Sequence, residues 1–245
     1  MKVAMEKKLT VGIIGLGFGA EFVSIYLDHP DVRSVVICDV DGRRLDGIGE
    51  KFNIERRYKD FEELVDAEDV DAIHILSGIP DHAWQVKRVL LSGKHCASTV
   101  PMATSLDDLH AIIDAQKTSG KNYMMMETAV YTRQFLFARS MKEKGEFGRI
   151  QFLRGAHYQD MERWPPYWDG LPPMWYATHA VSPLLEIAGS RAKCVQCYGS
   201  GVMRQELSQQ YNNPFPVETA IFQLEADGLA AEVTRSLFHC ARDYM

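Results

Sequence analysis

The 245-residue sequence has few cysteines, no long apolar run and no excess of basic charge. No apolar stretch approaches the ~20 residues that a membrane-spanning helix needs. The formal net charge of −6 argues against a nucleic-acid-binding protein, because such a protein needs a basic face. Residues 1–8 are polar and lack the apolar segment of a secretory signal. We therefore expect a cytoplasmic protein that binds neither membrane nor nucleic acid.

The five cysteines are sparse and odd in number, which is typical of reduced thiols rather than of a disulfide framework. Cys194 and Cys197 have the C-x-x-C spacing of some metal sites. No second pair and no histidine cluster accompany them, so we expect two positions of a strand and predict no metal site.

A glycine-rich segment follows the first apolar run. Residues 11–14 are apolar, and Gly15, Gly17 and Ala20 then follow the spacing G-x-G-x-x-G/A. In this pattern a strand turns sharply into a helix whose unpaired N–H groups face a pyrophosphate. The segment therefore predicts a dinucleotide-binding turn.

An acidic residue, Asp39, lies at the end of the second expected strand, residues 32–40. An acid about 20 residues beyond such a glycine turn accepts hydrogen bonds from the adenosine ribose hydroxyls. The alternative is that Asp39 merely caps the turn at Asp41-Gly42. Because a carboxylate repels a 2′-phosphate, we expect NAD, while Arg43 and Arg44 keep NADP as the less favoured cofactor.

Strands and helices alternate as far as residue 127. The expected strands cover 11–14, 32–40, 70–76, 94–99 and 122–127, and the expected helices 21–27, 61–67, 82–92 and 106–119. This alternation predicts a doubly wound parallel sheet of the Rossmann type, with ligands beyond the carboxyl ends of its strands.

The pattern changes in the second half. We expect helices over 131–144 and from about 178 to 188, a proline- and aromatic-rich loop over 161–173, strands over 150–158, 194–203, 217–226 and 229–238, and a hairpin turn at 226–228. The prediction is a dinucleotide-binding Rossmann domain (1–130) followed by an α/β domain with an open, mainly antiparallel sheet (131–245) for substrate binding and oligomerisation. Because the sequence stops soon after a strand, we expect the C-terminal part of this domain to be missing.

Five motifs together carry a family resemblance: Gly15-Leu16-Gly17, Asp39, Pro80-Asp81-His82, Gly93-Lys94-His95 leading to Pro101-Met102-Ala103, and Gly145-Glu146-Phe147-Gly148-Arg149-Ile150. With them the chain resembles the Gfo/Idh/MocA family of nicotinamide-dependent sugar oxidoreductases over essentially its whole length. The resemblance implies a small sugar or polyol substrate and a homo-oligomer that forms through the C-terminal sheet.

The expected cofactor contacts combine the glycine turn with residues at the carboxyl ends of later strands. They are Gly15, Gly17, Phe18, Ala20, Asp39, Ser77, Ile79, His82, Thr99, Pro101 and Glu127. We expect Glu127 near the nicotinamide ribose, with a strand-end cap as the alternative.

Two catalytic positions of the family are changed in this chain. The family commonly has Glu-Lys-Pro where this chain has Thr99-Val100-Pro101, and valine cannot handle the proton of a substrate hydroxyl. The family also has an aspartate four residues before a histidine, and here Trp175 stands four residues before His179. The family's lysine, aspartate and histidine are thus reduced to His179.

A subgroup matches more closely. Val100-Pro101, Met124-Met125-Met126-Glu127, Tyr131-Thr132-Arg133 and Tyr176-Ala177-Thr178-His179 resemble NAD-dependent glycosidases of the α-N-acetylgalactosaminidase type. This resemblance implies that Tyr131, Tyr176 and His179 line the active site. Thr128-Ala129-Val130 replaces a cysteine-containing segment of that subgroup, so the substrate does not carry over.

Three functions stay open. The leading hypothesis is hydride transfer from a hydroxyl carbon of a sugar to NAD, with His179 as the base, because a histidine (ordinary pKa about 6.5) is suited to that task. The alternative is redox-assisted glycoside hydrolysis with retained NAD, in which His179 handles the C3 hydroxyl, Tyr131 takes the C2 proton and Tyr176 orients or donates. The third is a non-catalytic nucleotide-binding homologue.

Structural roles also stay open for the same residues. Tyr131 could serve in domain packing, and His179 could be a hydrogen-bonded core histidine. Trp164, Tyr167 and Trp168 form either a stacking platform for a sugar ring or a simple lid.

Overall fold

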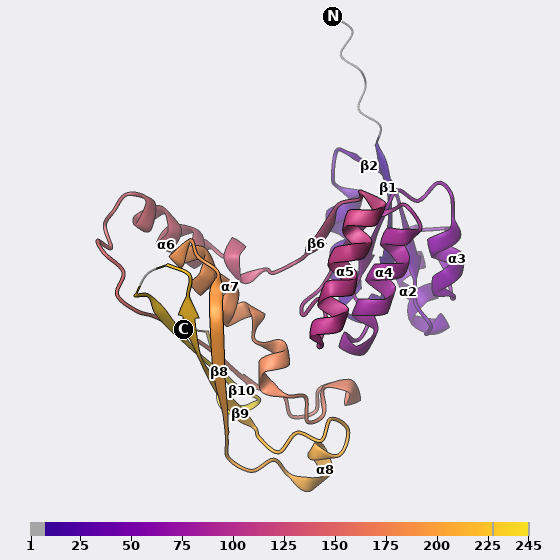
Figure 1. Cartoon of the computed structure of the whole chain (residues 1–245). Helices are drawn as coiled ribbons and strands as arrows, with labels where there is room; N and C mark the ends of the chain where they lie inside the picture. Colours follow the sequence, from indigo (N-terminus) through magenta and orange to yellow (C-terminus); the bar gives the residue numbers. More distant parts are fainter. Residues whose placement is uncertain (1–7, 227, 245) are drawn as a thin grey trace, which may run out of the picture. The chain divides into compact units, whose positions relative to one another are not determined.

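The computed structural model describes residues 8–226 and 228–244, and side chains as far as residue 238 apart from residue 227. The chain forms two compact units, Met1–Met126 and Glu127–Met245 (Figure 1). The division falls before residue 127 rather than after residue 130, because the short helix that follows Glu127 packs on a helix of the second unit.

The first unit alternates strands and helices: β1 (Leu9–Ile14), α1 (Leu16–Leu27), β2 (Val32–Cys38), α2 (Gly42–Lys51), β3 (Arg57–Tyr58), α3 (Phe61–Asp66), β4 (Ala72–Ile75), η1 (Ile79–Asp81), α4 (His82–Leu91), β5 (His95–Ser98), α5 (Leu106–Ser119) and β6 (Tyr123–Met125). The strands pair in the order β3-β2-β1-β4-β5-β6, and every pair is parallel. The predicted doubly wound sheet is confirmed.

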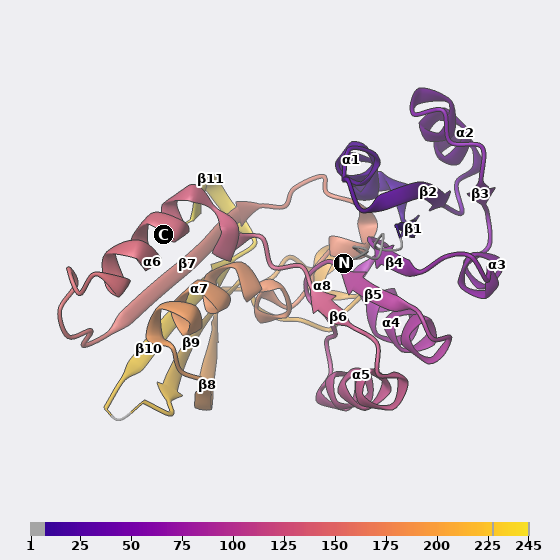
Figure 2. The same ribbon diagram turned by 90° about the horizontal axis from the view of Figure 1, so that it is seen from above.

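Helices cover both faces of this sheet (Figure 2). On one face α1 and α2 pack on β1 and β2 around Ile13 and Ile37. On the opposite face α3, α4 and α5 pack around Ile73 and Ile75. Strands that are buried on both faces need continuous apolar sequence, which is why the apolar runs marked them.

Three elements differ from the expectation. α1 begins at Leu16 instead of residue 21, because Gly15 ends the strand with φ +87° and the glycine segment itself forms the first helical turn. No expected element corresponds to α2, because its sequence is mostly polar and only Leu45 and Gly49 are buried. The Asp41 side chain caps this helix by accepting hydrogen bonds from the N–H groups of Arg43 and Arg44. Residues 57–58, where no strand was expected, form the edge strand β3.

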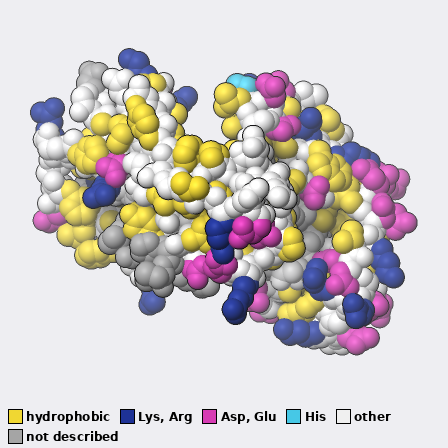
Figure 3. Space-filling model, turned by 90° about the horizontal axis from the view of Figure 1, so that it is seen from below, with side chains coloured by type: hydrophobic (Ala, Val, Ile, Leu, Met, Phe, Trp, Pro, Cys, Tyr) yellow, Lys and Arg dark blue, Asp and Glu magenta, His cyan; other side chains and the backbone are white. Residues whose placement is uncertain are grey.

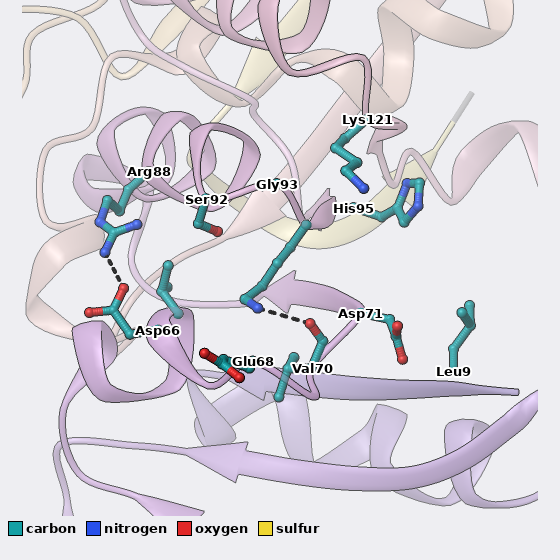
Figure 4. A pocket seen from close by; sticks show the side chains of 12 residues that line it. Leu9, Asp66, Glu68, Val70, Asp71, Arg88, Ser92, Gly93, His95 and Lys121 are labelled. Carbon is teal, nitrogen blue, oxygen red and sulfur yellow. Dashed lines mark hydrogen bonds and ion pairs between the residues drawn. The ribbon is translucent and has the colours of Figure 1, made fainter. Parts of the chain in front are cut away.

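A cavity of about 680 Å³ lies at the amino-terminal edge of the sheet, the edge opposite the glycine turn (Figure 4). Lys94 is buried there, and its ammonium group donates hydrogen bonds to the carbonyl oxygens of Ala67 (2.8 Å) and Val70 (2.9 Å). Burial lowers the pKa of Lys94, against the nearby carboxylates that raise it. Lys94 thus ties the connection between α3 and β4, and we assign this cavity a structural role.

The second unit contains η2 (Ala129–Tyr131), α6 (Arg133–Glu143), β7 (Leu153–Asp160), η3 (Pro166–Trp168), η4 (Pro173–Tyr176), α7 (Thr178–Ala188), β8 (Ala192–Ser200), α8 (Gln205–Ser208), β9 (Val217–Leu224), β10 (Ala230–Ser236) and β11 (Phe238–Tyr244). The sheet order is β11-β7-β10-β9-β8. Only β7 and β10 pair in parallel, so the expectation of a mainly antiparallel sheet is confirmed. β11 is an unexpected fifth strand. The expected hairpin turn includes residue 227, which lies outside the described residues.

One face of the second sheet is covered by α7, which packs on β7 and β10 around Ala180, Leu184 and Val233. On the other face, Thr219 and Thr234 join β9 to β10 by a 3.0 Å hydrogen bond. Cys194 and Cys197 lie in β8 and, being three residues apart, point to opposite faces. Their thiols and those of Cys38 and Cys96 are free, and the Cys240 side chain is not among those described.

Two glycines with positive φ allow the cost of backbone strain to be compared with the added cost of a steric clash. A Cβ on Gly15 (φ +87°) would lie 2.5 Å from the Leu76 carbonyl oxygen, whereas a Cβ on Gly93 (φ +82°) would meet nothing within 4 Å. We expect Gly93→Ala to lower the free energy of unfolding by about 1 kcal/mol, from strain alone. Gly15→Ala adds a clash with backbone and should cost about 3 kcal/mol or more. Urea unfolding followed by circular dichroism measures both, and equal costs would contradict this account.

Candidate active site

The glycine turn leaves room for a phosphate. A Cβ on Gly17 would meet nothing within 4 Å, and Gly17 is exposed in the first turn of α1. The small residue that brings the helix onto the strand is Gly19, whose added Cβ would lie 3.2 Å from Ile13 Cγ2, while Ala20 is only half-buried. An open helix N-terminus with a small residue at its surface fits the pyrophosphate of NAD.

Asp39 is buried beneath this turn. Its Oδ2 accepts a hydrogen bond from the Leu16 N–H at 2.7 Å, and its Oδ1 accepts one from the Asp41 N–H at 2.8 Å. Arg44 lies 3.3 Å from the same carboxylate. Asp39 therefore does stabilise the following turn, as the alternative held. Its contact with a ribose remains a prediction.

The predicted cofactor residues of two later loops lie together. The His82 ring is buried, and its nitrogens lie 2.7 Å from the Pro101 carbonyl oxygen and 3.0 Å from that of Ser77. The Thr99 hydroxyl lies 3.3 Å from the same ring. Burial lowers the pKa of His82, even though the backbone contacts raise it. His82 thus joins the loops after β4 and β5, at the sheet edge where Gly15 lies; Ile79 is buried beside them.

The second unit places a carboxylate, an imidazole and a phenol in a row. Glu127 Oε1 lies 2.6 Å from His179 Nδ1, and His179 Nε2 lies 3.1 Å from the Tyr176 hydroxyl. The Glu127 carboxylate also accepts the Ala129 N–H at 2.8 Å. Glu127 precedes η2, Tyr176 ends η4 and His179 lies in the first turn of α7. The chain thus brings together two of the three predicted catalytic residues with Glu127, which we had expected at the ribose.

The Glu127 carboxyl carries the negative charge of this row. Burial raises the pKa of the Glu127 carboxyl, but the hydrogen bonds from His179 and from the Ala129 N–H outweigh it, so this pKa lies below its ordinary value. An ionised Glu127 can only accept, so His179 Nδ1 carries the proton and Nε2 is free to take another.

His157 lies beside this row, with its ring centre 5.3 Å from that of His179 and 5.6 Å from that of Tyr176. Burial, together with Arg235 and His179, lowers the pKa of His157 to about 2. His157 is therefore neutral at physiological pH and forms an uncharged wall of the site.

His179 also lines a cavity of about 570 Å³. Its polar lining includes Thr128, Thr132 and Gln134, and its apolar lining includes Phe135 and Leu184. A cavity of this volume has the size of an ordinary small-molecule site.

Tyr131 lies outside the row, with its side chain 62% exposed. Of the aromatic loop, Trp168 meets the Tyr176 ring edge-on at 4.7 Å, and Trp164 and Tyr167 contact Trp168 at 5.3 and 5.6 Å. Within the described part of the chain, no group of three or more metal-ligating side chains occurs.

Sequence reasoning missed Arg235, which is completely buried next to Tyr176. A signal for it exists: Ala231, Val233 and Arg235 occupy alternate positions of one strand, and the first two are core residues.

The first unit, with its parallel sheet, open glycine turn and strand-end acid, has the architecture of a dinucleotide-binding Rossmann protein. Residues 9–127 match the family model for Gfo/Idh/MocA, described as "Oxidoreductase family, NAD-binding Rossmann fold". This part of the chain matches the model of that family, and the predicted resemblance is confirmed.

Relatives and solved structures extend the comparison. "Glycosyl hydrolase family 109 protein 1" of Bacteroides fragilis strain YCH46 is 30% identical over 196 residues, which are 72% of this chain and 42% of that protein. A probable dehydrogenase from Thermotoga maritima has a TM-score of 0.83 at 22% identity, over 96% of this chain and 71% of that one. Scyllo-inositol dehydrogenase from Lactobacillus casei, with bound NAD(H) and scyllo-inositol, has a TM-score of 0.81 at 18% identity, over 98% and 72%.

The structural likeness establishes the fold, and this chain spans less than half the length of the curated relative. Among the described residues, none of the helices combines the length and apolarity that a bilayer crossing demands.

The open surface at Gly17 generates a test of NAD binding. A methyl group from Gly17→Ala would occupy that surface, so we expect NAD to bind at least tenfold more weakly while stability stays equal or rises slightly, because alanine favours helix. Gly47→Ala in α2, where a Cβ also meets nothing within 4 Å, is the control. It should leave NAD affinity unchanged. Isothermal titration with NAD measures both, and unaltered affinity in Gly17→Ala would place the phosphates elsewhere.

Proposed function

We propose that this chain is part of an NAD-dependent oxidoreductase that removes hydride from a hydroxyl carbon of a sugar or polyol. The observation that carries the proposal is the bonded row Glu127–His179–Tyr176, in which one imidazole nitrogen is held by a carboxylate and the other is directed at a phenol. An imidazole held in this way is suited to accept a proton in general base catalysis.

The roles follow from the hydrogen bonds. His179 Nε2 takes the proton of the substrate hydroxyl, and the Glu127 carboxylate stabilises the imidazolium that forms. Tyr176 donates to Nε2 before substrate arrives and then orients the sugar oxygen. Bound NAD, held by the turn at Gly17 and by Asp39, supplies the hydride acceptor. Since Val100 stands at the family's lysine position, His179 is the proposed base.

The second candidate is redox-assisted glycoside hydrolysis, which the B. fragilis relative favours because its name places it among glycosyl hydrolases. His179 would act on the C3 hydroxyl as above. Oxidation at C3 acidifies the C2 hydrogen, and an ionised Tyr131 would take that proton while the group at C1 leaves. Addition of water at C1, return of the proton to C2 and return of the hydride to C3 would then complete the hydrolysis with no net oxidation of the sugar. The exposed position of Tyr131 is compatible with this role.

Two assays on the purified protein separate these reactions. NADH accumulation with a sugar supports the dehydrogenase, and release of nitrophenol from a nitrophenyl glycoside without NADH accumulation supports the hydrolase. If both fail while NAD remains bound, a non-catalytic nucleotide-binding homologue is the better account. Absence of bound NAD, and of affinity for added NAD, would overturn both enzymatic proposals.

We propose NAD rather than NADP as the cofactor and the cytoplasm as the location. Supporting the first, Asp39 carries a carboxylate beneath the glycine turn, and Arg44 is already paired with Asp39 (3.3 Å) and Asp41 (3.7 Å). Supporting the second, the four described thiols are free. Parallel titrations with NAD and NADP test the cofactor, and tighter binding of NADP would contradict it.

We also propose that the face of the second sheet opposite α7 joins copies of the chain. β8 is an edge strand that is exposed throughout, and Tyr198 and Ile221 are exposed on neighbouring strands. Figure 3 shows one face of the molecule, on which hydrophobic side chains are interspersed with charged ones. Tyr198→Asp should reduce the molar mass found by light scattering, whereas Phe137→Asp on α6, also exposed, should not. A wild-type monomer would contradict the proposal.

Glu127→Gln tests the base. The amide keeps the shape of the carboxylate but cannot compensate an imidazolium, so we expect kcat to fall by about 10²- to 10⁴-fold with little change in KM. The control is Glu186→Gln, which removes an exposed carboxylate of α7 paired with Arg139 at 3.7 Å. That variant should retain wild-type kcat. Full activity in Glu127→Gln would remove Glu127 from the mechanism.

A further inference from the structure

We propose that Arg235 is a positioning residue that holds Tyr176 against His179 and so sets the rate of proton transfer. The expected effect on kcat rests on the proposed function. The positioning role itself does not depend on the reaction, because it is inferred from the contacts of the buried Arg235 guanidinium.

Arg235 contacts Tyr176 in two ways. Its Nε donates a hydrogen bond to the Tyr176 carbonyl oxygen at 3.0 Å, and its guanidinium carbon lies 5.5 Å from the centre of the Tyr176 ring. The first contact fixes the backbone at the end of η4, and the second is a cation–π contact with the ring. Arg235 therefore restrains both the backbone and the ring of Tyr176.

The guanidinium is itself immobilised by the sheet. Nη1 donates to the His157 carbonyl oxygen at 3.1 Å and to that of Ser236, and Nη2 donates to Gln159 Oε1 at 2.7 Å. Arg235 and His157 are register partners on β10 and β7. Because the donors of an arginine form a rigid fork, these contacts fix its plane. Through Arg235, the position of Tyr176 is therefore fixed relative to β7 and β10.

The Tyr176 ring has little other freedom. Trp168 meets it edge-on at 4.7 Å, and the His157 ring lies 5.6 Å away. Its hydroxyl then lies 3.1 Å from His179 Nε2. α7 begins two residues after Tyr176, so the hydrogen bond from Arg235 to the Tyr176 carbonyl oxygen restrains the backbone directly before this helix.

The chemistry explains why an arginine stands here. Removing a cation from water is costly, and a buried arginine is retained where its hydrogen bonds do something that an apolar residue cannot. Packing alone would be served by a residue such as Val233, which lies on the same face of β10 and is equally buried. The donors of Arg235 hold its guanidinium against the ring and the backbone of Tyr176, which an apolar side chain could not do.

The kinetic test compares Arg235→Met with Val233→Ala, which removes core contact without touching Tyr176. We expect both variants to lose stability and to keep NAD affinity, but only Arg235→Met to lower kcat, by about 10- to 100-fold, with KM changed less than twofold. In a Tyr176→Phe background, Arg235→Met should have no further effect on kcat. If Val233→Ala lowers kcat equally, or if the effects of Arg235→Met and Tyr176→Phe multiply, the proposal is overturned.

A second readout does not need turnover. With histidines labelled with ¹⁵N, the His179 imidazole resonance at fixed pH should shift alike in Arg235→Met and Tyr176→Phe, and remain in place in Val233→Ala. An unshifted resonance in Arg235→Met overturns the positioning role. If the wild-type chain turns over no sugar or glycoside, the proposed function fails, while this measurement still decides the role of Arg235.

Discussion

The second unit is arranged around a hydrogen bond of 2.6 Å between the Glu127 carboxylate and His179 Nδ1. It ties the residue that follows the parallel sheet in sequence to the first turn of α7. Because the carboxylate stays ionised, the bond decides which imidazole nitrogen carries the proton and leaves the other for chemistry. The positions of Tyr176, His157 and Arg235 matter because they surround this pair.

The two units use backbone and side chains differently. In the first unit, the proposed cofactor site is built from backbone N–H groups at a helix N-terminus, where glycine leaves space and the Asp39 carboxylate accepts the Leu16 N–H. In the second unit, the proposed proton acceptor and its partners are titratable side chains. This division explains why a family can keep the first part and vary its chemistry through the second.

Val100 and Trp175 stand where the family commonly has a lysine and an aspartate. Val100 contributes no charge to the loop that His82 holds, and the mechanism that we propose therefore assigns proton transfer to the second unit. There the carboxylate partner of the histidine comes from Glu127, a residue far from it in sequence, rather than from the position of Trp175. A proton acceptor paired with a carboxylate is thereby retained, although the residues that build it differ.

The sequence by itself determined the parallel fold of the first unit and its glycine turn, because apolar runs and glycine spacing are local properties. His179 and Tyr176 were singled out by the resemblance of a short motif, Tyr176-Ala177-Thr178-His179, to a family subgroup, and their roles remain proposals. Tertiary structure alone decided that Glu127 bonds His179, that Tyr131 stays apart from them, and that Arg235 lies under Tyr176. Those contacts join residues separated by tens of positions, and side-chain pairing across such distances depends on strand order and register, which residue spacing does not encode.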